Sequence, residues 1–86
     1  MKIFLLEDEA MLSDAIEEYL VASNHKVTSM SDGTHALDHL KVQPYDLLIL
    51  DINVPGISGL DLLEQLHALK IRTPAIYISA LVDISN

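Results

Sequence analysis

Four short apolar segments recur at similar intervals along the chain. They are Ile3–Leu6, Val27–Met30, Leu47–Leu50 and Ala75–Ile78. Three of them are continuously apolar, which is typical of strands buried on both faces of a parallel sheet. The second, Val-Thr-Ser-Met, is less apolar and favours an edge strand.

The segments between these strands have the spacing of amphipathic helices. Ser31 or Asp32 can cap the second helix, and Ser58 with Asp61 resembles a capping box at the start of the third. The residues expected to face inward are, in chain order, Leu12, Ile16, Tyr19 and Leu20; Ala36, Leu37 and Leu40; and Leu62, Leu63, Leu66 and Leu69. The resulting order β-α-β-α-β-α-β predicts one α/β domain over residues 1–86, built on an open parallel sheet with helices on both faces.

The fourth predicted strand is composed like an interior strand, which needs a neighbour on each side. The residues after Val82 are too few to supply one. We therefore expect that a further strand and helix are missing or come from another chain. An exposed apolar edge and a partly bare sheet face invite pairing, so a homodimer through the fourth strand or that face is predicted.

Composition and charge narrow the possible functions. The chain has 86 residues, no cysteine, and a net charge of −8 from 5 basic and 13 acidic residues. Without cysteine there is neither a disulfide scaffold nor a cysteine-based metal site. The negative charge disfavours nucleic acids and anionic membranes as partners. The apolar runs are too short to span a bilayer, and the first residues do not form a secretory signal, so the cytoplasm is the expected location.

Acidic residues follow two of the predicted strands. Glu7 and Asp8 come directly after the first, and Asp51 ends the third. In open α/β sheets, ligands bind beyond the carboxyl ends of the strands, where neighbouring strand ends meet. Converging carboxylates need a cation, and oxygen ligands of this kind suit Mg²⁺. Ser79, after the fourth strand, offers a hydroxyl to an anionic group at the same edge, whereas Glu9 alone is expected only to favour a helix N-terminus.

These residues resemble the receiver domain of two-component response regulators. The resemblance covers the whole chain. It rests on Leu-Leu-Glu-Asp-Glu at 5–9, Asp-Ile-Asn-Val-Pro-Gly-Ile-Ser-Gly at 51–59 with the apolar strand before it, and Ile-Tyr-Ile-Ser-Ala at 76–80. It implies a three-layer, flavodoxin-like receiver fold with strand order 2-1-3-4, lacking the last strand and helix of the family.

The resemblance also implies roles for single residues. Asp51 would accept a phosphoryl group from a phosphohistidine of a sensor histidine kinase. Asp8 would bind Mg²⁺ directly and Glu7 through water, while Asp51 and the backbone carbonyl of Asn53 would complete the protein ligands. Ser79 would be the switch hydroxyl that turns toward the phosphoryl group. Phosphoryl transfer depends mainly on positioning and charge neutralisation, which agrees with such a cluster.

The family places a lysine that pairs with the phosphoryl group after its fifth strand, which this chain does not reach. None of the lysines present is expected to replace it. We therefore expect an N-terminal part of a receiver domain, of about 120 residues when five strand–helix units are complete. An output domain, often DNA-binding in this family, would lie elsewhere in the longer protein.

Other functions remain open from the sequence. A haloacid-dehalogenase-like phosphatase also uses a strand-end Asp with Mg²⁺, but needs a second acid where this chain has Asn53. A phosphorylation-independent interaction module would keep the acids without using them. No glycine-rich phosphate-binding motif supports a nucleotide-binding fold, and no separate enzymatic turnover is expected. His35 and His39 have metal-binding spacing but are expected to be solvated, because no third ligand is near.

Overall fold

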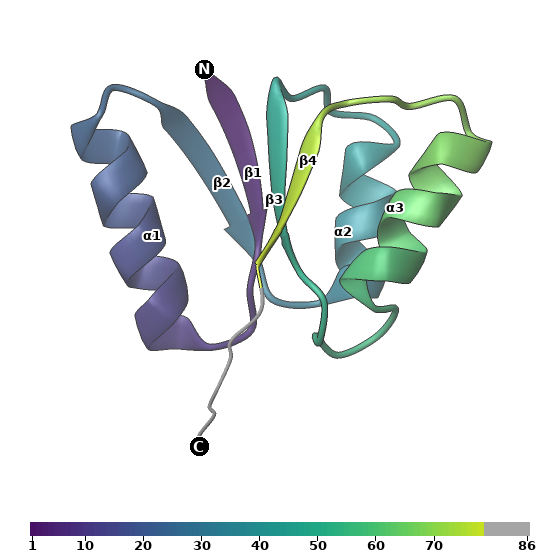
Figure 1. Ribbon diagram of the computed structural model, residues 1–86, viewed down its shortest axis with the longest axis horizontal. Helices are drawn as coiled ribbons and strands as arrows, with labels where there is room; N and C mark the ends of the chain where they lie inside the picture. Colours follow the sequence, from purple (N-terminus) through teal and green to yellow (C-terminus); the bar gives the residue numbers. More distant parts are fainter. Residues whose placement is uncertain (79–86) are drawn as a thin grey trace.

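The computed structural model describes residues 1–78 of the chain. Strands and helices alternate throughout this part (Figure 1). The elements are β1 (Lys2–Leu6), α1 (Ala10–Ala22), β2 (Lys26–Met30), α2 (Gly33–Leu40), β3 (Leu47–Asp51), α3 (Gly59–Ala68) and β4 (Ala75–Ile78). The predicted order of elements is confirmed, and each predicted strand lies within one residue of the observed bounds.

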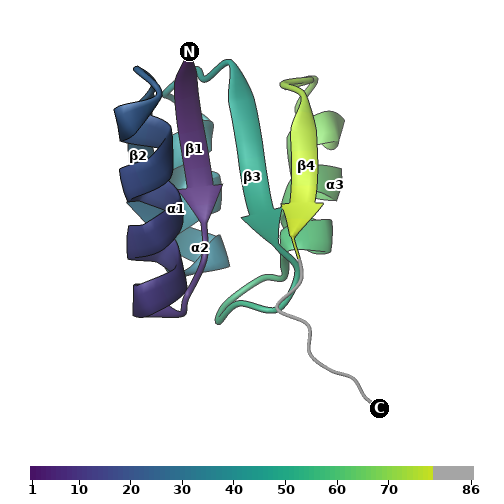
Figure 2. The same cartoon turned by 60° about the vertical axis from the view of Figure 1, so that its left-hand side comes forward.

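The four strands form one parallel sheet with the order β2-β1-β3-β4. Helix α1 covers one face, and α2 and α3 pack side by side on the other (Figure 1). Figure 2 shows β1, β3 and β4 running in the same direction, so their carboxyl ends meet at one edge. This is the flavodoxin-like order that was predicted, and β2 is the predicted edge strand.

The main core lies between the sheet and the pair α2 and α3. Alternation along the strands turns Phe4, Leu6, Leu48 and Leu50 to this side. They meet the apolar faces of the two helices, formed by Ala36, Leu37, Leu40, Leu62 and Leu66. The intervening strand residues, Ile3 and Leu5, are buried on the face that α1 covers.

Two helix starts are fixed by side-chain caps. Asp32 accepts hydrogen bonds from the backbone N–H groups of Thr34 and His35 at the start of α2. Ser58 accepts one from Asp61 at the start of α3. Ser58 was predicted as a cap, and of the two candidates Ser31 and Asp32 the structure has Asp32. Both caps hold helices whose first residues lie beside the carboxyl edge of the sheet.

Two predicted core residues are exposed. Tyr19 is 72% exposed, because the buried stripe of α1 runs through Ile16, Leu20 and the buried Ser13, and Tyr19 lies at the edge of that stripe. Leu69 is 51% exposed, because it caps the C-terminus of α3 instead of lying within the helix. The helical spacing predicted α1 and α3 correctly, but it wrongly included Tyr19 and Leu69 in their buried faces.

Strand β4 is an edge strand within residues 1–78. Its Ile76 is 52% exposed and its Tyr77 is 39% exposed, so an interior-like sequence stands at an open edge. The predicted additional neighbour would involve residues after 78, which lie outside the described part of the chain. No helix within the described part is long and apolar enough to span a lipid bilayer.

Candidate functional site

Three acidic side chains meet at the carboxyl edge of the two central strands. Glu7 follows β1 and Asp51 ends β3, and these strands are parallel neighbours. One carboxylate oxygen from each of Glu7, Asp8 and Asp51 lies within 4.8 Å of the others. The exposed fraction is 2% for Glu7 and 3% for Asp51, whereas Asp8 is exposed. The cluster thus has a buried base and one side open to solvent.

Glu7 is the most constrained member of the cluster. Its backbone N–H donates to the carbonyl of Met30 at 3.0 Å, which ties the end of β1 to the end of β2. Its Oε2 accepts the N–H of Glu9 at 3.0 Å. Its Oε1 is buried and has no hydrogen-bond partner among the described residues. A buried oxygen of this kind is costly unless another group coordinates it.

The surroundings of Glu7 oppose its negative charge. Burial raises the pKa of its carboxyl above the ordinary value of 4.5, and the nearby carboxylates of Asp51 and Asp8 raise the pKa further. Only the hydrogen bond from the N–H of Glu9 acts in the opposite direction. A cation placed among these oxygens would remove the repulsion and satisfy Oε1.

The carboxylate of Asp51 is oriented by the loop that follows it. Its Oδ1 accepts the backbone N–H of Asn53 at 3.1 Å. The N–H of Gly59 donates to the carbonyl of Ile52 at 3.0 Å, which holds the start of α3 against the end of β3. A Cβ atom at Gly59 would lie 2.2 Å from the carbonyl oxygen of Asp51. Glycine is therefore needed at this position for the close approach of helix and strand.

The same loop is held from its other side by α2. The N–H of Gly33 donates to the carbonyl of Pro55 at 2.9 Å, and a Cβ atom at Gly33 would lie 1.8 Å from the carbonyl oxygen of Ile57. Gly56 has a φ of 78°, in the left-handed region, and packs against the start of α2. We call residues 52–58 the acceptor loop, which is thus clamped between the N-termini of two helices.

The sequence pattern did not predict the role of α2 in this site. Gly33 is the first residue of α2, and glycine favours a helix less than alanine does. An Asp-Gly pair at a helix start was the available signal, because a glycine there indicates a close approach of another backbone. The partner of that approach could be known only from the fold.

The other predicted site residues have different outcomes. Among residues 1–78, Glu7, Asp8 and Asp51 form the one group of three metal-ligating side chains. Ser79 lies outside the described residues. The prediction that His39 is solvated was wrong: its ring is half-buried, stacks on Phe4 with centroids 5.8 Å apart, and shares a 2.6 Å hydrogen bond with the hydroxyl of Tyr45. His35 is exposed, as predicted.

The donor set of the acidic cluster fits Mg²⁺. All its side-chain ligands are carboxylate oxygens, and Asp8 leaves the cluster accessible from solvent. Mg²⁺ is commonly held by a few carboxylates while keeping several waters. The uncoordinated Oε1 of Glu7 supports a resident cation independently of the sequence.

Comparison with known proteins gives a consistent result. Residues 3–86 match the family model described as the response regulator receiver domain. The transcriptional regulatory protein CrdR of Helicobacter pylori is 39% identical over 83 residues, which cover 95% of this chain and 39% of CrdR. The cell cycle transcriptional regulator CtrA of Caulobacter vibrioides is 34% identical over 86 residues, which cover all of this chain and 37% of CtrA. The chain thus spans less than two fifths of the length of these relatives.

Solved structures share the fold. The receiver domain of the Francisella response regulator 1452 superimposes with a TM-score of 0.89 at 28% identity, covering 95% of this chain and 68% of that one. The response regulator TrrA of Thermotoga maritima, solved in complex with Mg²⁺ and beryllium fluoride, gives 0.86 at 30% identity, covering 93% and 70%.

Proposed function

Because the chain belongs to the response regulator receiver domain family, we propose that Asp51 is its phosphoacceptor and that Glu7, Asp8, Asp51 and the carbonyl of Asn53 hold Mg²⁺. Phosphorylation-based two-component signalling is the function of this family, and sensor histidine kinases phosphorylate its members. The observation that carries the proposal is the cluster of Glu7, Asp8 and Asp51, with Asp51 buried and oriented at the end of a central strand.

The proposed reaction transfers one phosphoryl group. A carboxylate oxygen of Asp51 attacks the phosphorus of a phosphohistidine. The new O–P bond forms as the N–P bond breaks, and the imidazole leaves with the electron pair of that bond. Because the N–H of Asn53 holds Oδ1 at 3.1 Å, Oδ2 is the oxygen that we assign as the nucleophile. Holding the carboxylate in one orientation lowers the entropic part of the barrier.

The acidic cluster explains why a cation is needed. Three carboxylates at this edge repel an incoming phosphoryl group. When bound, Mg²⁺ neutralises charge on the carboxylates and on the phosphoryl oxygens. Support also comes from TrrA, whose structure contains Mg²⁺ and beryllium fluoride. Ser79 as the switch hydroxyl rests on the family resemblance alone.

The test is phosphorylation of the purified chain by acetyl phosphate with Mg²⁺, followed by intact mass spectrometry. We expect a mass increase of one phosphoryl group, which hydroxylamine removes because the product is an acyl phosphate. Asp51→Asn should abolish the increase. Asp38→Asn, which changes an exposed carboxylate on α2, should leave it unchanged.

An unmodified wild-type chain that still binds Mg²⁺ would contradict the assignment of Asp51 as acceptor in this chain. It would favour the phosphorylation-independent interaction module instead. Turnover of a phosphate ester that disappears in Asp51→Asn would indicate a phosphatase.

The names of the relatives support a proposal about partners. Their names describe transcriptional regulators, so we propose that phosphorylation at Asp51 controls a DNA-binding output domain elsewhere in the protein. The domain would act in the cytoplasm, where a kinase can use ATP. We also propose a homodimer that covers the exposed Ile76 and the open edge of β4.

A further inference from the structure

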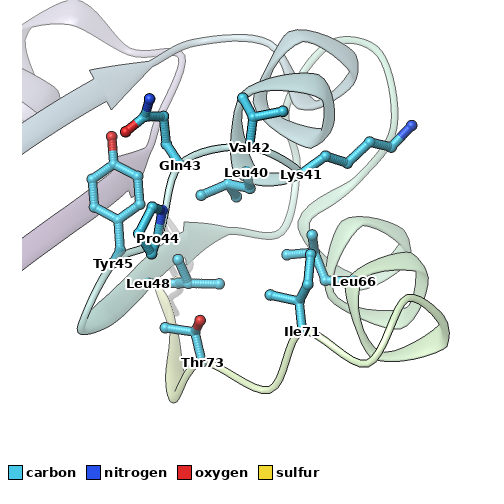
Figure 3. A pocket seen from close by; sticks show the side chains of 10 residues that line it. All are labelled: Leu40, Lys41, Val42, Gln43, Pro44, Tyr45, Leu48, Leu66, Ile71 and Thr73. Carbon is cyan, nitrogen blue, oxygen red and sulfur yellow. The ribbon is translucent and has the colours of Figure 1, made fainter.

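A second concave site lies at the opposite end of the sheet from the acidic cluster. A pocket of about 280 Å³ opens between the end of α2, the α2–β3 connection, α3 and the α3–β4 connection. Figure 3 shows Leu40, Leu48, Leu66 and Ile71 converging on this space, with Tyr45 at its border. We call it the amino-end pocket, because it lies where β3 and β4 begin.

The size and lining of the amino-end pocket favour a single apolar side chain as its occupant. Its volume is at the lower limit for small-molecule sites, which commonly measure about 300–1,000 Å³. Its lining residues Leu48 and Leu66 are apolar and almost fully buried, whereas Val42 is exposed and Ile71 is partly buried. Lys41 is the one charged residue among those that line the pocket, and one large apolar side chain would remove the exposed surface of Val42 and Ile71 from water.

Positive charge gathers at this end of the sheet. Lys41 lines the pocket, and the Lys2 ammonium lies 4.9 Å from the ring centroid of Tyr45. Lys70 and Arg72 are exposed and flank the lining residue Ile71 in the sequence. All five basic residues of the chain lie near the amino ends of the strands, although the net charge is −8.

Two carboxylates offset part of this charge. A carboxylate oxygen of Asp38 lies 3.8 Å from the ammonium of Lys41, and the side chains are 46% exposed for Lys41 and 73% for Asp38. Asp46 accepts the backbone N–H of Lys2 at 2.7 Å. Four cations against two carboxylates still leave this end positive, while the other end of the sheet carries the acidic cluster. A negatively charged partner is therefore attracted here and repelled there.

We propose that the amino-end pocket binds an acidic peptide segment of a partner protein. One large apolar residue of that segment enters the pocket, and carboxylates on both sides of it face Lys41, Lys70 and Arg72. This combination of one buried anchor and a charged rim is the usual anatomy of a specific peptide site. The site is separate from Asp51 and goes beyond phosphoryl transfer.

The test uses the full chain and a fluorescein-labelled probe peptide, Glu-Asp-Glu-Phe-Asp-Glu-Glu. Anisotropy gives the affinity, and methyl NMR spectra locate the contact. We expect shifts at Leu40, Leu48 and Ile71 and none at Asp51. Replacing the peptide Phe by Ala should weaken binding at least about fivefold, and replacing its acids by amides should do the same.

Matched variants of the chain separate this site from general electrostatic attraction. Arg72→Glu and Lys26→Glu each reverse one exposed cation at the same end of the sheet, but Lys26 lies on β2, away from the pocket. We expect Arg72→Glu to weaken binding at least about fivefold and Lys26→Glu less than twofold, with unchanged methyl spectra of the free proteins. Affinity should also fall as salt is raised.

Several results would overturn the proposal. Equal effects of Arg72→Glu and Lys26→Glu would indicate attraction to overall charge alone. Equal binding of the Phe and Ala peptides would show that the pocket takes no anchor. Undiminished binding of the amide peptide would remove the acidic requirement, and no binding of the Phe peptide would reject the site.

Discussion

At the scale of single residues, Glu7 has an unusual environment for a carboxylate. It is 2% exposed, its Oε1 has no partner among residues 1–78, and two further carboxylates face it. We expect Glu7→Gln to stabilise the metal-free protein at neutral pH by about 1 kcal/mol or more, because it removes a buried charge and keeps the shape. The same change should weaken Mg²⁺ binding.

The sign of the pH dependence follows from the raised pKa of Glu7. The folded state holds this proton more tightly than the unfolded state, so ionisation destabilises the fold above the raised pKa. The advantage of Glu7→Gln should therefore be absent below the ordinary value of 4.5 and grow as the pH rises from 4.5 to 7. Urea unfolding from pH 7 to 4.5 measures this difference. Glu64→Gln, at an exposed position on α3, is the control and should show no such trend.

Gly33 gives a second prediction at this scale. A Cβ atom there would meet the carbonyl oxygen of Ile57 at 1.8 Å, so Gly33→Ala must displace the acceptor loop or the start of α2. We expect a loss of about 1–3 kcal/mol in stability and a fall of about tenfold or more in Mg²⁺ affinity. Calorimetry measures the loss of stability, and the amide shifts of Asn53 and Ile57 during a Mg²⁺ titration measure the affinity.

A control distinguishes loop displacement from general destabilisation. Leu66→Ala removes a core side chain of α3 and should cost about 2–5 kcal/mol. Leu66 lies near the C-terminal end of α3 and lines the amino-end pocket, whereas the acceptor loop precedes the other end of this helix. Mg²⁺ affinity should therefore be retained below the melting temperature of this variant. If Gly33→Ala and Leu66→Ala lower the Mg²⁺ affinity equally, the contacts between α2 and the acceptor loop do not position the site.

The acidic cluster was predictable because its residues follow strands. Glu7 and Asp51 end neighbouring parallel strands, and alternation along those strands turns both side chains to the same place. The burial of His39 was not predictable in this way. It depends on Phe4 and Tyr45, which reach it from other parts of the chain.

At the scale of elements, β4 combines an apolar sequence with an edge that is open among residues 1–78. Ile76 pairs in register with Ile49, on the face of the sheet that α1 packs against. Ile76 is 52% exposed, so α1 does not cover this part of the face. If a second copy covers this surface, Ile76→Lys should shift the chain toward the monomer by placing a charge in the interface. Light scattering over a concentration series measures the change.

The matched control is Val42→Lys, which also replaces an exposed apolar residue but lies on the α2–β3 connection. It should leave the oligomeric state unchanged. A wild-type chain that is monomeric at all concentrations would contradict the homodimer.

Elements were predicted well because each has its own local signal. Continuous apolar runs marked the strands, and Asp32 and Ser58 marked two helix starts. The boundary of an apolar face was predicted less well. Tyr19 and Leu69 fit the helical spacing, but the extent of their burial depends on how far the sheet reaches beneath each helix.

At the scale of the whole molecule, the acidic cluster links metal binding to folding. Its ligands come from β1, β3 and the loops after them, so they meet only in the folded chain. Mg²⁺ at ten times its dissociation constant should therefore stabilise the fold by about 1.4 kcal/mol.

Thermal unfolding with and without Mg²⁺ measures this gain. Asp8→Asn should abolish it, whereas Asp61→Asn, on the exposed side of α3, should retain it. A melting temperature that does not respond to Mg²⁺ in the wild-type chain would argue against the site.

The central position of β1 has a consequence for how the chain folds during synthesis. β1 leaves the ribosome before β2, β3 and β4, yet Lys2 pairs with Lys26, and Ile3 pairs with Leu47. Phe4, Leu5 and Leu6 are fully buried in the finished sheet, so they stay exposed until β2 and β3 have emerged. Parallel pairing between distant segments is slow to form. The nascent chain therefore passes through a period in which the strand that is most buried in the folded domain is open to chaperones and to other nascent chains.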